Sequence, residues 1–517
     1  MLRHVEALAL RGIALACLAV VGSTAGIVRA EAQTTVTILQ SEPPRSMDPA
    51  DQTATFTGDV LEPMYEGLVA RGEDLKVHPS LATEWSVSED GLTWTFHLRE
   101  GVKFHDGSDF DAEAAKASFE RLMDESLGLA GAGRLRPLLQ SVEASDPHTL
   151  TIVLTRNYPA FLDLLTSAQA SIVSPAEAEK GDLGRVPVGT GPFKFVEWSS
   201  GNYVLEEANP DYWGDKAKVE QLKWTWSAEQ SVMNMALQTG DADIVNPLPP
   251  VFAQGVENNP DMDLIAQSGS AVFWIALNVQ IEPLDDVKVR QALNYATDRD
   301  ALVQALLRGY GTPADSPLAP IPPYHLDEAQ PYPYDVDKAK ALLEEAGVAD
   351  GFSMSVAVQE PEANIAEALQ GMWAKIGVKL EIRTLESGVW TKAAFNDPDA
   401  KKADNLGSVI ASWSSGGFNP DQQLRPLYDT DSWAPAGANL GFFSNEEFDQ
   451  LLDTAASTAD PAKRKELYDQ AQRIVNTEAP MVLLYVKQDL VGVKKGIEGI
   501  WVVPGGDVRA AYVDKSS

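Results

Sequence analysis

The segment from Trp413 to Asp421 carries the side chains best suited to holding a small molecule. Its aromatic residues offer flat apolar faces, its hydroxyl, amide and carboxylate groups offer hydrogen bonds, and its glycines let backbone groups approach a ligand closely. It follows a strand-like run at residues 408–411, and ligands bind at the carboxyl ends of strands in open α/β sheets. We therefore predict ligand contacts here, against the alternative of a surface loop whose aromatic side chain packs into the core. The candidate residues are Trp413, Ser414, Ser415, Gly416, Phe418, Asn419 and Asp421.

Arginines next to glycines form a candidate clamp for an anion. Arg134 and Arg136 lie beside Gly131 and Gly133, and a guanidinium group holds a carboxylate or phosphate through a planar fork of donors. Arg45 is a third candidate of the same kind. Each of these side chains could instead be a solvated surface arginine. We take Arg134 as the predicted clamp.

Residue patterns typical of catalysis are sparse. Six histidines occur, and His97 and His105, eight residues apart, match no HExxH or Cys/His ligand spacing. The sequence contains no GxSxG elbow, P-loop or GxGxxG motif. We therefore predict a protein that is not an enzyme, with no cofactor and no metal site. Two carboxylates that are distant in the chain can still form a glycosidase-like pair, so an exported hydrolase remains the alternative.

The N-terminus is typical of an export signal, predicted over residues 1–32. Arg3 and Arg11 give it a basic start, an apolar stretch follows, and its last three residues (AEA) supply a small-x-small cleavage site. A membrane anchor is the alternative, but about 17 apolar residues are at the short limit for a span. The only cysteine, Cys17, lies within this signal. We therefore predict a periplasmic protein whose mature chain has no disulfide, thiolate nucleophile or Cys-bound metal.

The chain is strongly acidic, with a net charge of −34. The predicted signal holds three basic and two acidic residues, so its removal leaves a charge of −35. This charge argues against nucleic acid or an anionic membrane surface as the natural partner. It does not by itself indicate a cationic ligand, because a solvated acidic surface explains it equally well.

Short strand patterns alternate with helix patterns along the chain, which favours an α/β fold. The length of 517 residues predicts two or three domains, because single cores stop growing near ~250–300 residues. Strands are predicted at residues 150–154 and 203–205. Helices are predicted at residues 337–346, directly after Asn445, and over residues 460–480.

The run from Leu81 to Gly107 is the most distinctive part of the sequence. Trp94, Phe96 and Leu98 alternate with polar residues, as in a half-buried strand, and turn residues flank them. The run resembles the signature block of the solute-binding proteins of family 5, the peptide/nickel type that serves ABC importers. Other segments resemble further blocks of this family in the same order, namely residues 189–193 (GTGPF), 236–243 (ALQTGDAD), 287–299 (VKVRQALNYATDR), 334–347, 373–378 (WAKIGV) and 448–480.

The resemblance implies an α/β fold of the type II periplasmic-binding-protein kind, with two lobes joined by a hinge and an additional inserted domain. Lobe I is expected to comprise residues 33–75, 185–276 and 485–517, the inserted domain residues 76–184, and lobe II residues 277–484. The lobes of such a protein close on a solute, and the membrane permease recognises the closed form. The implied partners are a small-molecule or peptide ligand and the transmembrane subunits of an ABC permease. We expect a monomer that binds no nucleic acid.

The resemblance also bears on the ligand. A second wall of the cleft is expected from Thr53 and Phe56, which precede a helix expected to start near Gly58. In the family's dipeptide and oligopeptide binders, an acidic residue three positions after the tryptophan holds the amino terminus of the peptide. That position is Gly416 here, which cannot pair with an ammonium group, while Asp421 could either compensate or cap the next helix. The expected function is capture of a peptide or similar small polar solute, with an opine, oligosaccharide, amino-acid conjugate or metal chelate as the alternative.

Overall fold

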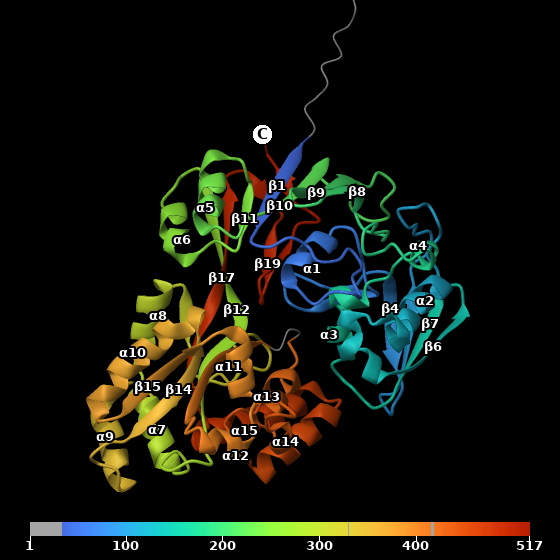
Figure 1. The fold of residues 1–517 in the computed structure, drawn as a ribbon. Helices are drawn as coiled ribbons and strands as arrows, with labels where there is room; N and C mark the ends of the chain where they lie inside the picture. The colour runs from blue at the N-terminus through green and yellow to red at the C-terminus, as the bar shows by residue number, and fades with distance from the viewer. Residues whose placement is uncertain (1–33, 329, 415–417, 517) are drawn as a thin grey trace, which may run out of the picture. The chain divides into compact units, whose positions relative to one another are not determined.

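The computed structural model describes residues 34–328, 330–414 and 418–516. The predicted signal peptide, Ser415 and Gly416 lie outside the described residues. No helix within those three ranges is long and apolar enough to cross a membrane. Helices and strands alternate along the described chain, so the predicted α/β class is confirmed (Figure 1).

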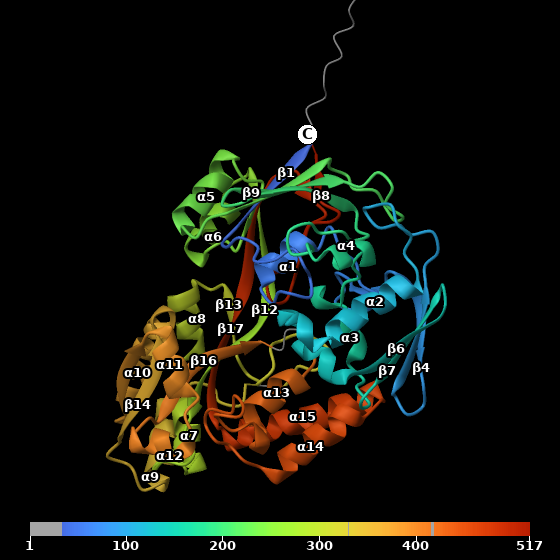
Figure 2. The same cartoon turned by 45° about the vertical axis from the view of Figure 1, so that its right-hand side comes forward.

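One sheet of eleven strands runs through the described chain (Figures 1 and 2). Its two longest strands, β12 and β17, pair antiparallel along almost their whole length. The sheet order is β15 (Lys379–Leu385), β14 (Ser353–Gln359), β16 (Ser408–Ser414), β12 (Met262–Leu277), β17 (Met481–Lys494), β11 (Ile244–Asn246), β1 (Thr35–Gln40), β10 (Gln221–Trp226), β9 (Tyr203–Ala208) and β8 (Phe193–Ser199), with β13 (Gly311–Pro313) also paired to β17.

Side chains of β12 alternate between two hydrophobic clusters on opposite faces of the sheet, together called the central core. Val272 and Trp274 belong to one cluster, and Phe273 and Ile275 to the other. This follows from the period of two residues in a strand. The helices of this part of the chain are α7 (Val287–Tyr295), α8 (Arg299–Leu307), α9 (Val336–Glu345), α10 (Ala363–Trp373), α11 (Ser387–Ala394), α12 (Pro398–Ala403), α13 (Asp421–Tyr428), α14 (Glu446–Ser457) and α15 (Pro461–Glu478).

A separate antiparallel sheet builds what we call the four-stranded core, whose members fall between residues 68 and 188 apart from Ala50. Trp94, Phe96 and Leu98 are buried in it, which confirms the strand predicted from their alternation. The elements of this part are β4 (Ala82–Val87), β5 (Thr93–Leu98), β7 (Thr149–Leu154) and β6 (Leu139–Asp146) in sheet order, with helices α2 (Ala112–Met123), α3 (Phe161–Leu165) and α4 (Pro175–Lys180).

A third group of buried residues, the terminal core, joins the two ends of the described chain. It draws on residues 36–65, 173–262 and 490–513. Its helix α1 contacts strand β20, and α1 begins three residues before the expected start because Ala54 is the last residue with extended backbone. The remaining elements are α1 (Thr55–Leu61), β2 (Val69–Arg71), β3 (Val77–Pro79), α5 (Gln230–Thr239), α6 (Pro250–Glu257), β18 (Ile497–Glu498), β19 (Trp501–Val503), β20 (Asp507–Arg509) and β21 (Asp514–Lys515).

The three predicted helices are confirmed, and each begins with a side-chain cap. Asp335, Asn445 and Asp460 accept hydrogen bonds from backbone N–H groups in the first turns of α9, α14 and α15. Such caps satisfy donors that have no partner inside the helix. Asn445 and Asp460 therefore predicted where α14 and α15 start, whereas α9 was predicted from its apolar face.

Lys401 in α12 is buried in the central part of the structure without a carboxylate partner among the described residues. Its ammonium group donates to the Leu440 carbonyl at 2.8 Å and lies 4.7 Å from the centroid of the Phe442 ring. Burial lowers the pKa of Lys401 to about 7. An unfolded lysine titrates near ~10.4, so the unfolded chain binds more protons between these values and stability should rise with pH, by at most about 1.4 kcal/mol per unit.

We predict that Lys401→Met removes the rise in stability with pH. The free energy of unfolding, measured by urea denaturation at about pH 7.5 and about pH 9, should increase for the wild type relative to the variant. Lys402→Met, at the exposed neighbouring position, is the control and should keep the wild-type slope. Identical pH slopes in all three proteins would contradict a depressed pKa at Lys401.

Candidate functional site

A cavity of about 290 Å³ opens where α1 and the β19–β20 hairpin approach α3, the middle of β12 and the end of β16. A neighbouring cavity of about 240 Å³ shares six of its lining residues. Ligand pockets commonly measure about 300–1,000 Å³, so this space suits a small ligand. The charged residues that line the first cavity are Asp59, Arg71, Arg134, Asp163, Asp507 and Arg509.

Arg71 forms a fixed part of the cavity wall. Its Nη2 donates to Asp163 Oδ1 at 2.8 Å and its Nη1 donates to the Leu75 carbonyl at 2.8 Å. The side chain is only 5% exposed, and its Cζ lies 4.4 Å from the centroid of the Phe418 ring. Cation–π contact of this kind orients both groups. Arg71 therefore ties Phe418 to the wall that carries α3.

The β19–β20 hairpin contributes a second charged group of residues. Asp59 on α1 accepts hydrogen bonds from the Val508 N–H at 3.0 Å and from Asn246 Nδ2 at 3.2 Å. Burial, together with the charge of Asp507, raises the pKa of Asp59 well above its ordinary value. Burial also raises the pKa of Asp507, an effect that Arg509 partly offsets. The carboxylates of Asp59 and Asp507 thus lie close together, and the guanidinium of Arg509 lies near both.

Four of the ten predicted contact residues line this cavity together: Thr53, Arg134, Ser414 and Phe418. They come from three separate segments of the chain, since Ser414 and Phe418 lie four positions apart. Arg134 is exposed, and its side chain makes no ion pair or hydrogen bond with another described residue. Its guanidinium therefore remains available to an anion.

Asn419 and Asp421 lie beside the cavity and not on its wall. Asn419 Nδ2 donates to the Tyr158 hydroxyl at 2.5 Å. This hydrogen bond joins the residues just before α13 to the segment before α3. Asp421 is the first residue of α13 and pairs with Arg425 one turn later, at 3.0 Å. Its carboxylate is therefore occupied within its own helix.

Trp413 and Phe56 are also absent from the cavity lining. The Trp413 indole packs against the central core, and its Nε1 donates to the Gln422 carbonyl at 3.0 Å. Phe56 is half-buried on α1. Of the other arginines, Arg45 pairs with Glu42 at 3.2 Å and Arg136 donates to the Leu122 carbonyl at 2.8 Å. Ser415 and Gly416 fall outside the described residues.

Sequence reasoning missed Arg71, Asp163, Ser270, Asp507 and Arg509, all of which line the cavity. The turn signal Pro-Gly-Gly before Asp507 predicts a hairpin, and charged residues that flank a tight turn are frequent on any surface. Nothing local to these residues indicates that they share a cavity. They meet only because the C-terminal hairpin packs on α1, which lies more than 440 residues earlier, as in the Val508–Asp59 hydrogen bond.

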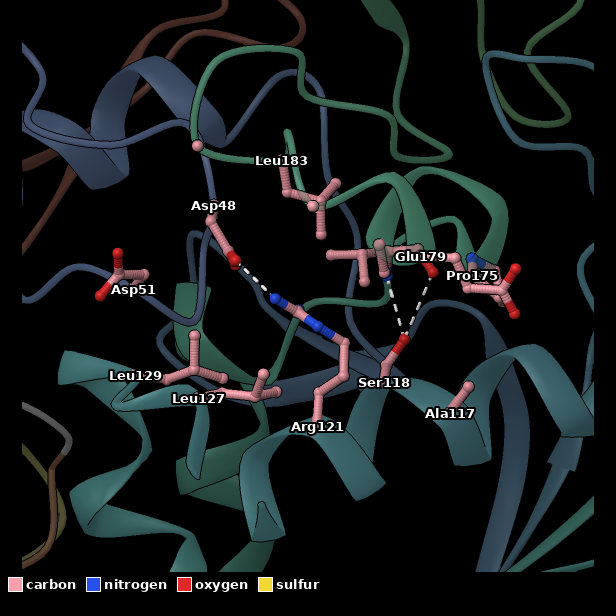
Figure 3. Close-up of a pocket in the computed structure, with 14 residues that line it drawn as sticks. Asp48, Asp51, Ala117, Ser118, Arg121, Leu127, Leu129, Pro175, Glu179 and Leu183 are labelled. Atoms are coloured by element: carbon pink, nitrogen blue, oxygen red, sulfur yellow. Dashed lines mark hydrogen bonds and ion pairs between the residues drawn. The ribbon is translucent and has the colours of Figure 1, made fainter. Parts of the chain in front are cut away.

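A larger cavity, of about 470 Å³, lies between α2, α4 and the segment around Asp48 (Figure 3). Its central charges neutralise each other, because Arg121 Nη2 lies 2.5 Å from Asp48 Oδ2. Ser118 is likewise bonded to backbone groups of Ala114 and Val173. Its wall comes from residues 48–51, 117–129 and 173–184 alone. The Asp48–Arg121 pair and Ser118 are thus bonded within the protein, so the cavity next to the β19–β20 hairpin is the better candidate for a solute.

Of the two histidines in the run from Leu81 to Gly107, His97 is exposed and His105 is enclosed. His105 Nε2 lies 3.0 Å from the Gly191 carbonyl, and burial lowers the His105 pKa to about 4. Gly191 must be glycine because an added Cβ would lie 2.4 Å from the Pro63 carbonyl oxygen. Within the described part of the chain, no group of three or more His, Cys, Asp or Glu side chains is arranged to hold a metal ion.

Comparison with known proteins gives a consistent result. A family model described as bacterial extracellular solute-binding proteins, family 5 Middle, matches residues 76–435. The glutathione-binding protein GsiB of Escherichia coli (strain K12) is 33% identical over 465 residues, which cover 89% of this chain and 90% of that protein. The structure of HbpA2 from Haemophilus parasuis has a TM-score of 0.84 at 29% identity, covering 93% of this chain and 100% of that one. The periplasmic binding protein DppA from Helicobacter pylori, in complex with the peptide STSA, has a TM-score of 0.73 at 27% identity, covering 93% and 99%.

We predict that the two arginines of the cavity differ in their effect on stability. Arg71→Met leaves the partly buried Asp163 without its partner and should lower the free energy of unfolding by about 2–4 kcal/mol. Arg134→Met removes no internal contact and should change it by less than about 0.5 kcal/mol. Urea denaturation of both variants measures this difference. Equal losses would mean that Arg134 is bound within the protein.

Proposed function

We propose that this chain, which belongs to the bacterial extracellular solute-binding proteins of family 5, captures a short peptide in the cavity between α1, the β19–β20 hairpin, the middle of β12 and the end of β16. It has the type II periplasmic-binding-protein fold predicted from its sequence. It is the solute-binding component of an ABC importer. What remains to be proposed is the solute, the site and the way in which the two lobes hold it.

The names of two relatives favour a peptide. GsiB is a glutathione-binding protein, and the solved DppA structure holds the peptide STSA. Glutathione is a tripeptide whose glutamate is linked through its side-chain carboxyl group. We infer that a tripeptide of this size and charge is the preferred solute. The observation that carries the proposal is a small cavity lined by Phe418 and by two arginines, Arg134 and Arg509, without ion pairs among the described residues.

We propose the division into lobes expected from the sequence, namely residues 33–75, 185–276 and 485–517 for lobe I, 76–184 for the inserted domain and 277–484 for lobe II. Three separate hydrophobic cores support it. Contacts of Phe418 with Arg71 and of Asn419 with Tyr158 support closure of lobe II on the rest of the protein. A solute that touches both sides stabilises the closed form, because it binds that form more tightly.

The cellular setting follows from the family. We propose export through the signal at residues 1–32, a periplasmic location for the mature chain, and delivery of the solute to the transmembrane subunits of a permease. The chain is proposed to act as a monomer, to bind no nucleic acid and to release its solute chemically unchanged. Its acidic surface, with a net charge of −34, supports the exclusion of nucleic acid.

A thermal-shift panel tests the solute. Reduced glutathione, the tetrapeptide Ser-Thr-Ser-Ala, an opine and a nickel–histidine chelate should be compared, and glutathione should give the largest shift. A ligand at about 100 times its Kd adds about 2.7 kcal/mol to the stability of the folded state. Mass spectrometry of the recovered peptide should find it intact. A shift with the opine or the chelate alone would contradict the peptide proposal, and cleaved peptide would favour the hydrolase alternative.

Arg134 is predicted to contribute to affinity through a carboxylate of the solute. Arg134→Met should weaken glutathione binding by about tenfold, since a charge-assisted hydrogen bond is worth about 1.5–3 kcal/mol. Arg45→Met removes a paired arginine outside the cavity and serves as the control. Isothermal titration calorimetry of both variants measures the effect. Unchanged affinity in Arg134→Met would remove this residue from the site.

A further inference from the structure

Strand β20 presents a carboxylate and a guanidinium side by side to the cavity. Asp507 and Arg509 both line it, while Val508 between them is buried in the terminal core. Residues two apart on a strand share a face and lie roughly 6.8 Å apart along it. The pair is thus a closely spaced anion and cation on one wall.

Neither side chain is held in a direct ion pair, although the charge of Arg509 acts on Asp507 from a distance. Asp507 and Arg509 make no ion pair within 4 Å and no side-chain hydrogen bond to another residue of the described chain. Arg509 Nε is buried and without a hydrogen-bond partner among those residues. Burying a charged donor without a partner is costly. Such a pair is suited to a ligand that carries a cationic group for Asp507 and an anionic group for Arg509.

The other charged groups of the cavity, apart from Arg134, are already engaged. Arg71 is paired with Asp163 at 2.8 Å. Asp59 accepts from the Val508 N–H and from Asn246 Nδ2. Arg134 is unpaired, but it stands alone on another segment with no carboxylate bound to it. Asp507 and Arg509 are therefore the one uncommitted pair of opposite charges among the described lining residues.

The hairpin that carries the pair is held rigidly. Gly505 and Gly506 adopt positive φ values of 121° and 91°, which favour glycine and permit the tight turn. The Gly505 N–H donates to Asp489 Oδ2 at 2.9 Å, which anchors the turn to β17. Cross-strand pairing with β19 places Val503 opposite Asp507 and Trp501 opposite Arg509. The backbone that carries the two charged side chains is thereby fixed before a ligand arrives, which lowers the entropic cost of binding.

We propose that Asp507 and Arg509 recognise an α-amino-acid head, in which a free ammonium and a free carboxylate sit on the same carbon. This inference rests on the proposed peptide function and narrows its substrate class to peptides linked through a side-chain carboxyl group. A γ-glutamyl peptide keeps both charges on one carbon. An ordinary α-linked peptide separates them by its whole length, so it cannot satisfy both partners at once.

The test compares two tripeptides of identical composition, γ-Glu-Ala-Gly and α-Glu-Ala-Gly, by calorimetric titration of the full mature protein. Alanine replaces cysteine so that thiol oxidation does not interfere. We expect the γ-linked isomer to bind at least about tenfold more tightly, because the nearest free carboxylate of the α-linked isomer is its side-chain one, two methylene groups farther from the ammonium. Equal affinities would overturn the inference and leave the proposed peptide function standing. No binding of either isomer or of any tripeptide would instead overturn the proposed function, and the inference with it.

Variants then assign the effect to the pair. Asp507→Asn should weaken binding of γ-Glu-Ala-Gly by about tenfold and leave glutaryl-Ala-Gly, which lacks the ammonium, within about twofold. Arg509→Gln should weaken both ligands, and Arg509→Lys should restore part of the loss. Asp399→Asn, at an exposed position on α12, is the matched control. Discrimination between the isomers that persists in Asp507→Asn would assign the head to other residues and overturn the proposal.

If Asp507→Asn fails to fold, two ligand analogues test recognition of the ammonium and of the α-carboxylate with the wild-type protein alone. Glutaryl-Ala-Gly lacks the ammonium group, and the α-carboxamide of γ-Glu-Ala-Gly lacks the α-carboxylate. Each should bind wild-type protein about tenfold more weakly than the parent peptide. Full affinity of either analogue would show that the group it lacks is not recognised.

Discussion

The pairing of β12 with β17 is the constraint on which the rest of the structure depends. These strands carry residues of both the terminal and the central cores, so one hydrogen-bonded ribbon connects the two. Its register shifts between Ser268 and Val272, and such irregularities bend and twist a strand pair locally. Ser270 lies in this interval and lines the cavity, while Asp489 on β17 holds the Gly505 turn. The β12–β17 pair therefore positions the β19–β20 hairpin relative to the cavity wall that contains Ser270.

Electrostatics explains how so acidic a protein offers a site for an anionic solute. The net charge is −34, yet the cavity is lined by three arginines as well as three aspartates. Arg71 and Asp163 form an ion pair with each other. Asp59 accepts hydrogen bonds from a backbone N–H and a side-chain amide. The charges left for a ligand are Arg134 and the pair on β20. Local geometry, and not net charge, determines what this cavity attracts.

Sequence patterns predicted the local elements better than the site. Alternation predicted β5, an apolar face predicted α9, and capping residues predicted α14 and α15, because these signals depend on neighbours in the chain. Arg134 and Phe418 were found from residue type, and they line the cavity. Trp413 was chosen for its indole ring, but that ring packs on the central core. Asp507 and Arg509 gave no signal, since their role depends on packing against α1, far away in sequence.

A crystal structure of the mature protein with γ-Glu-Ala-Gly tests the central claim most directly. We expect the peptide in the cavity between the β19–β20 hairpin and Phe418, with its ammonium at Asp507, its α-carboxylate at Arg509 and its far carboxylate near Arg134. A peptide bound in the larger cavity beside the Asp48–Arg121 pair would contradict it.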